Sequence, residues 1–115
     1  MVQPTPGNDS RAHDLPQAAD RVASEHPGLW EAFQRLGEQA SVAGPLDARS
    51  RRFVHLSLAI ASDSEGATHS HVRRALDENV SIEEIEHVAL LAITTLGWSR
   101  AMRGLSWVRD ITRAK

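Results

Sequence analysis

Apolar residues recur at three- and four-residue spacing through most of this 115-residue chain, and that spacing constrains the fold more than any other feature. No segment alternates apolar and polar residues with the period of two that a half-buried strand requires. Asn-Gly and Asp-Gly pairs, which commonly turn a β-hairpin, do not occur. The sequence therefore predicts an all-α single domain of about six helices.

Helix caps and helix breakers divide the chain into its expected helices. Asp47 can cap one helix, and Asn79 can end another in the left-handed conformation. Ser81 and Glu84 have the spacing of a capping box, which is the clearest helix start in the sequence. The expected helices cover residues 14–26, 27–43, 47–62, 67–78, 81–97 and 99–111.

The N-terminal segment differs from the remainder in composition. Residues 1–14 contain two prolines, one glycine and almost no apolar side chains, so they predict a disordered tail ahead of a domain over 15–115. The segment lacks the basic start and apolar run of a secretory signal. No apolar stretch approaches the roughly 20 residues that a bilayer span needs. We therefore expect a cytoplasmic protein with no membrane partner.

Charge and cysteine content exclude several classes of function. Thirteen basic residues stand against fifteen acidic ones, a formal net charge of -2, so no broad positive field is available to bind nucleic acid. The chain has no cysteine. Disulfides, thiolate metal sites and thiol nucleophiles are therefore excluded.

Some helices carry more apolar surface than one small domain can bury. Residues 53–61 are apolar nearly all round, and Trp107 and Ile111 lie on a different side of their helix from Leu105 and Val108. Large apolar patches usually mark an interface. We expect an obligate homo-oligomer that uses the Trp107 and Ile111 face and part of 53–61. A monomer with two exposed apolar residues is the alternative.

The histidines are the candidate chemical groups. On one helix His69 and His71 point about 200° apart, so a shared metal site is disfavoured and we expect no metal or cofactor. His71 can act as a general acid or base because an ordinary histidine pKa is about 6.5. Spacing alone favours a structural His71 bonded to a backbone carbonyl. His55 has apolar neighbours, and we expect it to be buried with partners for both ring nitrogens.

Three segments within residues 46–111 carry a resemblance to a known family. They read LDARSRRFVHLSLAIAS, SEGATHSHVRRAL and SIEEIEHVALLAITTLGWSRAMRGLSWV. In order and spacing they resemble the carboxymuconolactone decarboxylase family, which shares its fold with the alkyl hydroperoxidase D proteins. The resemblance implies an all-helical fold assembled as a trimer or hexamer.

The peroxidase branch of that family has a Cys-x-x-Cys-x-x-x-His motif, with a glutamate about twelve residues before the first cysteine. The matching positions here are Ser64, Ala67, His71 and Arg52. A serine hydroxyl cannot form a sulfenate or close a disulfide, so dithiol peroxidase chemistry is excluded. We expect Arg52 to lower the pKa of a neighbouring histidine and to bind a substrate carboxylate in a bidentate fork.

The decarboxylase branch lacks the cysteine pair and keeps the histidine, so it is the closer comparison. The resemblance implies acid-base chemistry of the lyase type, decarboxylation or a lactone reaction, on a small carboxylate or lactone. His71 would move a proton at the carbon that loses carbon dioxide, and Arg52 would bind a carboxylate. Glu65 or His55 would orient the imidazole, and Ser64 completes the implied site. The alternatives are a non-catalytic oligomeric module that binds small molecules or interacts with partners, and a peroxidase-related protein without its dithiol.

Overall fold

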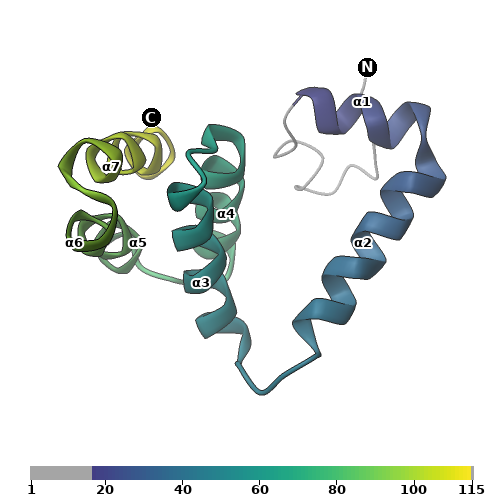
Figure 1. Cartoon of the computed structure of the whole chain (residues 1–115), viewed down its shortest axis with the longest axis horizontal. Helices are drawn as coiled ribbons and strands as arrows, with labels where there is room; N and C mark the ends of the chain where they lie inside the picture. The colour runs from purple at the N-terminus through teal and green to yellow at the C-terminus, as the bar shows by residue number, and fades with distance from the viewer. Residues whose placement is uncertain (1–16, 115) are drawn as a thin grey trace. The chain divides into compact units, whose positions relative to one another are not determined.

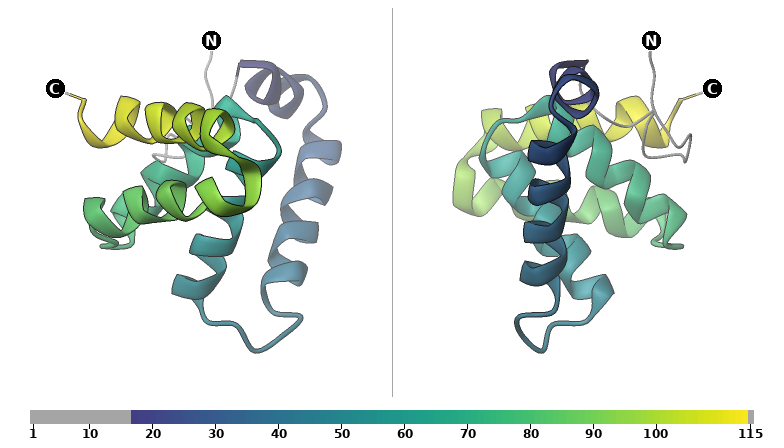
Figure 2. Two further views of the ribbon diagram at one scale, coloured as in Figure 1. Left: turned by 60° about the vertical axis from the view of Figure 1, so that its left-hand side comes forward. Right: turned by 90° about the vertical axis from the view of Figure 1, so that its right-hand side faces the viewer.

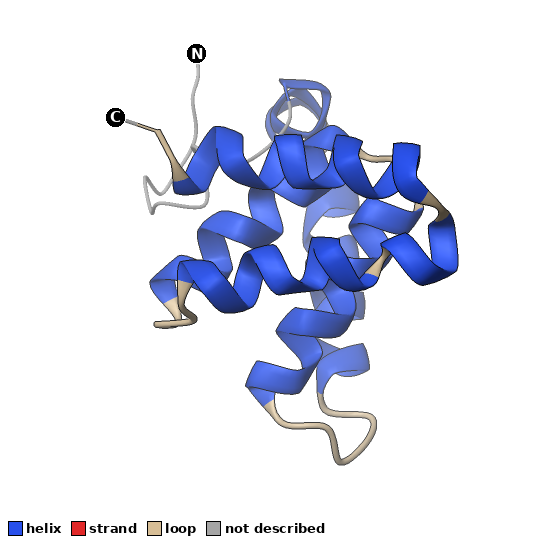
Figure 3. Ribbon diagram, turned by 90° about the vertical axis from the view of Figure 1, so that its left-hand side faces the viewer, coloured by secondary structure: helices blue, strands red, loops and turns tan. Residues whose placement is uncertain are grey.

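The computed structural model describes residues 17–114, which form seven helices and no strand (Figure 3). The predicted all-α class is confirmed for this part of the chain. The tail expected over 1–14 and the first residues of the expected domain lie outside the described residues. None of the described helices is long and apolar enough to cross a membrane. The helices are α1 (Gln17–Glu25), α2 (Pro27–Ser41), α3 (Ala48–Ala61), α4 (Glu65–Asp77), α5 (Ile82–Leu91), α6 (Ile93–Leu96) and α7 (Trp98–Thr112).

The chain divides into two compact units at residues 46 and 47. In the first unit α1 packs against α2, and Leu29, Phe33 and Leu36 of α2 are exposed. The second unit contains α3 to α7 (Figure 1). Every candidate site residue belongs to the second unit.

Local hydrogen bonds set the starts of α3 and α4. The Asp47 carboxylate accepts from the Ser50 backbone N–H at 2.8 Å, as a cap requires. Helix α4 begins two residues earlier than expected, because the Ser64 hydroxyl accepts from the Ala67 N–H at 3.2 Å. The break before α4 is correspondingly short and includes Asp63 at a φ of 60°.

The single helix expected over 81–97 is divided in two. The capping box at its start is confirmed, since the Ser81 hydroxyl and the Glu84 carboxylate each accept the other residue's backbone N–H. The Ala92 N–H is shared between the carbonyls of Val88 and Ala89, which tightens the chain there. Helix α6 then ends at Leu96, and the next residue, Gly97, has a φ of 92° that disfavours residues with a side chain.

The core of the second unit lies where α7 packs against α3, α4 and α5. Both views in Figure 2 place α7 alongside α5. Gly104 permits a close approach of α7 to α3, because a Cβ there would lie 2.6 Å from Cγ2 of Ile60. The buried apolar cluster consists of Leu56, Ile60, Val72, Ala75, Val80, Ile85, Ala89, Leu105 and Val108.

The prediction that Trp107 and Ile111 form an exposed apolar face on the last helix is wrong. Ile111 packs against the buried cluster, and Trp107 is also partly buried. The outer surface of α3 does expose large apolar side chains, with Val54 at 43% and Leu58 at 58% exposed. The part of the expected interface within 53–61 is therefore the part available for contact with a second chain.

Candidate functional site

Three of the expected site residues meet where α3 and α4 pack together. Arg52 and His55 lie on α3, and His71 lies on α4. Nη1 of Arg52 is 2.7 Å from Nδ1 of His71. The ring of His55 is 5.3 Å from that of His71 between centroids, with 35° between the ring planes. The two helices thus form one cluster of a guanidinium and two imidazoles.

A carboxylate that the sequence analysis did not select completes this cluster. Arg52 donates from Nε to Oε1 of Glu78 at 3.0 Å and from Nη2 to Oε2 at 2.8 Å. The bidentate fork expected to bind a substrate is thus occupied by a carboxylate of the chain itself. Glu78 follows His71 by seven residues, two helical turns, and this spacing was the available signal.

The contact with Arg52 determines the tautomer of His71. A guanidinium donates hydrogen bonds and cannot accept them, so Nδ1 of His71 must be the acceptor. In the neutral ring the proton is then on Nε2. His71 is therefore a hydrogen-bond donor through Nε2, held in place by Arg52 from the other side of the ring.

The surroundings of His71 keep its ring neutral. The pKa of His71 is lowered to about 4, chiefly by burial and in addition by the charges of Arg52 and Arg74, while Glu78 opposes them. The expected effect of Arg52 on the pKa is confirmed in direction, although burial is the larger cause. A ring with this pKa is a weak base near pH 7, which does not suit the proton-moving role first expected for His71.

His55 is exposed, so the expectation that it is buried among apolar residues is wrong. The helix α3 turns Leu56 and Ile60 into the core and leaves Val54 and His55 outside. Partial desolvation nevertheless lowers the pKa of His55, and the charge of Arg52 acts in the same direction. Its neighbours in sequence were misleading because a mostly apolar helix can still present one face to solvent.

Ser64 and Glu65 do not join the cluster around His71. Ser64 caps α4 through its hydroxyl, and its carbonyl accepts from the Thr68 hydroxyl at 2.7 Å. Glu65 lies six residues before His71, which places it about 120° around the helix. Glu65 instead shares a face of α4 with His69, which follows it by one helical turn. Glu65 is therefore not in position to orient the imidazole of His71.

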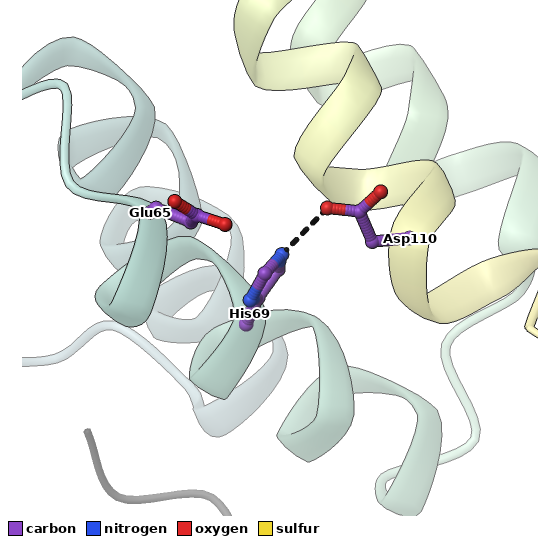
Figure 4. A group of neighbouring side chains, drawn as sticks. All are labelled: Glu65, His69 and Asp110. Carbon is purple, nitrogen blue, oxygen red and sulfur yellow. Dashed lines mark hydrogen bonds and ion pairs between the residues drawn. The ribbon is translucent and has the colours of Figure 1, made fainter. Parts of the chain in front are cut away.

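Glu65, His69 and Asp110 form a second polar group, between α4 and α7 (Figure 4). One ligand atom from each lies within 4.8 Å of the others, and Nε2 of His69 is 2.9 Å from Oδ2 of Asp110. As expected, His69 and His71 face different sides of α4. Asp110 was missed because it is 41 residues from His69, beyond the reach of any local spacing.

Comparison with known proteins gives one family-level result. The model of the carboxymuconolactone decarboxylase family matches residues 27–110. No curated protein matches the chain. The matched range extends from α2 to Asp110 of α7, so it includes both polar groups of the second unit.

Proposed function

Because the chain belongs to the carboxymuconolactone decarboxylase family, we propose that its His71 cluster catalyses a thiol-independent reaction of a small carboxylated lactone. The reaction class is decarboxylation of the lactone, a lyase reaction, in a chain without cysteine. One observation carries the proposal. Arg52 donates to Nδ1 of His71 at 2.7 Å, on an imidazole whose pKa is lowered to about 4 by burial and by neighbouring positive charge.

His71 acts in this proposal as a neutral donor rather than as a base. When the carboxylate leaves as carbon dioxide, the carbon–carbon bond breaks and its electron pair moves onto the lactone carbonyl oxygen. The Nε2–H of His71 donates to that oxygen as its negative charge develops. The resulting enolate is then protonated at carbon by solvent. A neutral imidazole stabilises this charge without quenching it by full proton transfer.

Arg52 positions the imidazole and supplies positive charge. Three of its five N–H groups are used, two by Glu78 and one by His71, and one remains on each terminal nitrogen. These two groups can bind a substrate carboxylate. The charge of Arg52 also favours an anionic substrate over a neutral one. Glu78 fixes the guanidinium plane, so it acts on the site through Arg52.

His55 is an exposed member of the cluster. Its exposed ring lies 5.3 Å from the ring of His71, close enough to contact the same small molecule. We assign it a role in binding the substrate and in exchanging protons with water. Truncation of His55 should therefore affect the rate less than truncation of His71.

The test measures carbon dioxide release from a panel of carboxylated lactones by the full chain. His71→Phe should lower kcat by about 100- to 1,000-fold, the range for removing one donor to a developing oxyanion. His71→Gln, whose amide can still donate, should retain part of the activity. Arg52→Gln should lower kcat because the ring is no longer held. His87→Ala, at an exposed histidine of α5, is the matched control and should leave the rate unchanged.

Two results would decide against catalysis. The first is that calorimetry detects binding of these lactones to the wild-type chain but no carbon dioxide is released from any of them. Equal rates for wild type and His71→Phe would likewise show that the ring takes no part. In the first case the chain is a binding module of the family, which is the alternative function. Circular dichroism of each variant separates loss of activity from loss of fold.

A further inference from the structure

We propose that Glu65, His69 and Asp110 bind a divalent transition-metal ion, with Zn²⁺ and Mn²⁺ as the best candidates. One imidazole nitrogen and two carboxylate oxygens, contributed by two helices, converge within 4.8 Å of one another. In Figure 4 the carboxylates of Glu65 and Asp110 point towards His69 from different sides. This group lies on another side of α4 from the His71 cluster, so the proposal is independent of the proposed function.

The helices place the three ligands without rearrangement of the backbone. Glu65 and His69 are four residues apart on α4 and share a face, and Asp110 lies on α7, which packs against α4. Bonds of about 2.1 Å at a right angle put neighbouring ligand atoms about 3.0 Å apart. Nε2 of His69 and Oδ2 of Asp110 are already 2.9 Å apart. Rotation of the long, exposed Glu65 side chain brings in the third ligand.

The charge balance of this group differs from that of the other acidic groups between helices. Asp63 pairs with Arg103, Glu78 with Arg52 and Glu86 with Arg109. In the described part of the chain, by contrast, Asp110 pairs only with His69, and Glu65 forms no hydrogen bond or ion pair. Two carboxylates thus approach one imidazole without an arginine between them. A divalent cation supplies the positive charge that an arginine supplies elsewhere.

The donor set indicates the kind of metal. An imidazole nitrogen favours transition metals over Mg²⁺ and Ca²⁺, and two carboxylate oxygens suit Zn²⁺ and Mn²⁺. Three protein ligands leave at least one position for water or another small molecule. His69 is partly buried while Glu65 and Asp110 are exposed, so an ion can enter directly from solvent. Such a site would join the first half of α4 to the end of α7.

The experiment uses the full chain, freed of metal with a chelator, and ZnCl₂ or MnCl₂ alone as the probe. Calorimetry and equilibrium dialysis should give one ion per chain. His69→Ala, Glu65→Gln and Asp110→Asn should each weaken binding at least about tenfold. Zinc should also raise the melting temperature of the wild-type chain and should do so much less for Asp110→Asn. Manganese should broaden the NMR signals of the His69 ring more strongly than those of any other histidine ring in the described residues.

The matched control is the pair Glu83 and His87 on α5, which has the same four-residue spacing. In the described residues no third ligand joins that pair. Glu83→Gln and His87→Ala should leave metal affinity unchanged. The proposal is overturned if the wild-type chain binds neither ion at 100-fold excess over protein, or if His69→Ala binds as tightly as wild type. Loss of binding in His87→Ala with retention in His69→Ala would also overturn it.

Discussion

His71 illustrates how a single side chain can couple the proposed chemistry to stability. Its ring is neutral for two reasons. Burial would leave a charged imidazolium poorly solvated, and the positive charge of Arg52 would repel it. The arrangement that makes the ring a donor at neutral pH also opposes its protonation in acid. His71 therefore binds a proton less readily in the folded chain than in the unfolded chain.

We predict that His71 makes the free energy of unfolding depend on pH between about 4 and 6.5. The folded pKa is about 4, below the unfolded value of 6.5, so the unfolded chain binds more protons in this window. Stability should rise with pH across the window, by roughly 2 to 3 kcal/mol from this residue, and should be flat above it. Urea unfolding at several pH values measures this slope. His71→Gln should remove most of it, and His55, whose pKa is also lowered by desolvation and by Arg52, should account for the remainder.

Carboxylates provide a control in a separate pH range. Hydrogen bonds from Arg49 and Ser81 lower the pKa of Glu84 to about 2, from 4.5. Its contribution is present above pH 4.5 and is lost as the pH falls towards 2. A slope between pH 4.5 and 6.5 that is as steep in His71→Gln as in wild type would contradict the assignment to His71.

The residue scale also shows where sequence reasoning about the site succeeds and where it stops. The family resemblance led us to expect Arg52 and His71 in one site, and the structure brings the two side chains together. Glu78 was missed although its seven-residue spacing from His71 was readable. Asp110 could not be found, because the contact between α4 and α7 depends on how the helices pack. The exposed state of His55 depends on helix orientation in the same way.

At the scale of the helices, local signals were the most informative. Asp47 and Ser81 were predicted as caps because a cap needs only the next three residues. Asn79 has the expected left-handed conformation, with a φ of 65°. The break at Ala92 carried no such signal, because alanine is a good helix former and continuous apolar spacing ran through it. Its position is set by the tertiary structure.

We predict that Ser81→Ala lowers the free energy of unfolding by about 1 kcal/mol. The substitution removes the acceptor for the Glu84 N–H at 3.1 Å and half of the capping box. Chemical denaturation measures the change. Ser57→Ala is the control, since among the described residues this exposed hydroxyl in α3 bonds only the carbonyl of Val54. It should change stability by less than half as much.

Packing of α7 on α3 leads to a second prediction at this scale. Gly104→Ala should destabilise the chain by about 1 to 3 kcal/mol, because the new methyl group would lie 2.6 Å from Cγ2 of the buried Ile60. Ile60→Ala removes that atom and should itself be destabilising. The double variant should be more stable than the sum of the single effects predicts. Strict additivity in the double-mutant cycle would contradict the close contact.

At the scale of the whole molecule, the exposed apolar surface of α3 bears on self-association. The family resemblance and the exposed Val54 and Leu58 on α3 lead us to predict a homo-oligomer, a trimer or hexamer, that covers this surface. Leu58→Glu should lower the oligomeric state in sedimentation experiments. Thr94→Glu, at an exposed position of α6, should not. A wild-type chain that sediments as a monomer would contradict the prediction.

Helix α4 carries its two histidines towards different neighbours, with His71 beside α3 and His69 beside α7. The chain thus contains two natural spectroscopic reporters only two residues apart, each sensitive to a different helix–helix contact. Binding at one contact that leaves the other undisturbed would change one ring signal alone. A rigid rotation of α4 would change both together. The two rings can therefore distinguish local binding from movement of the whole helix without any added label.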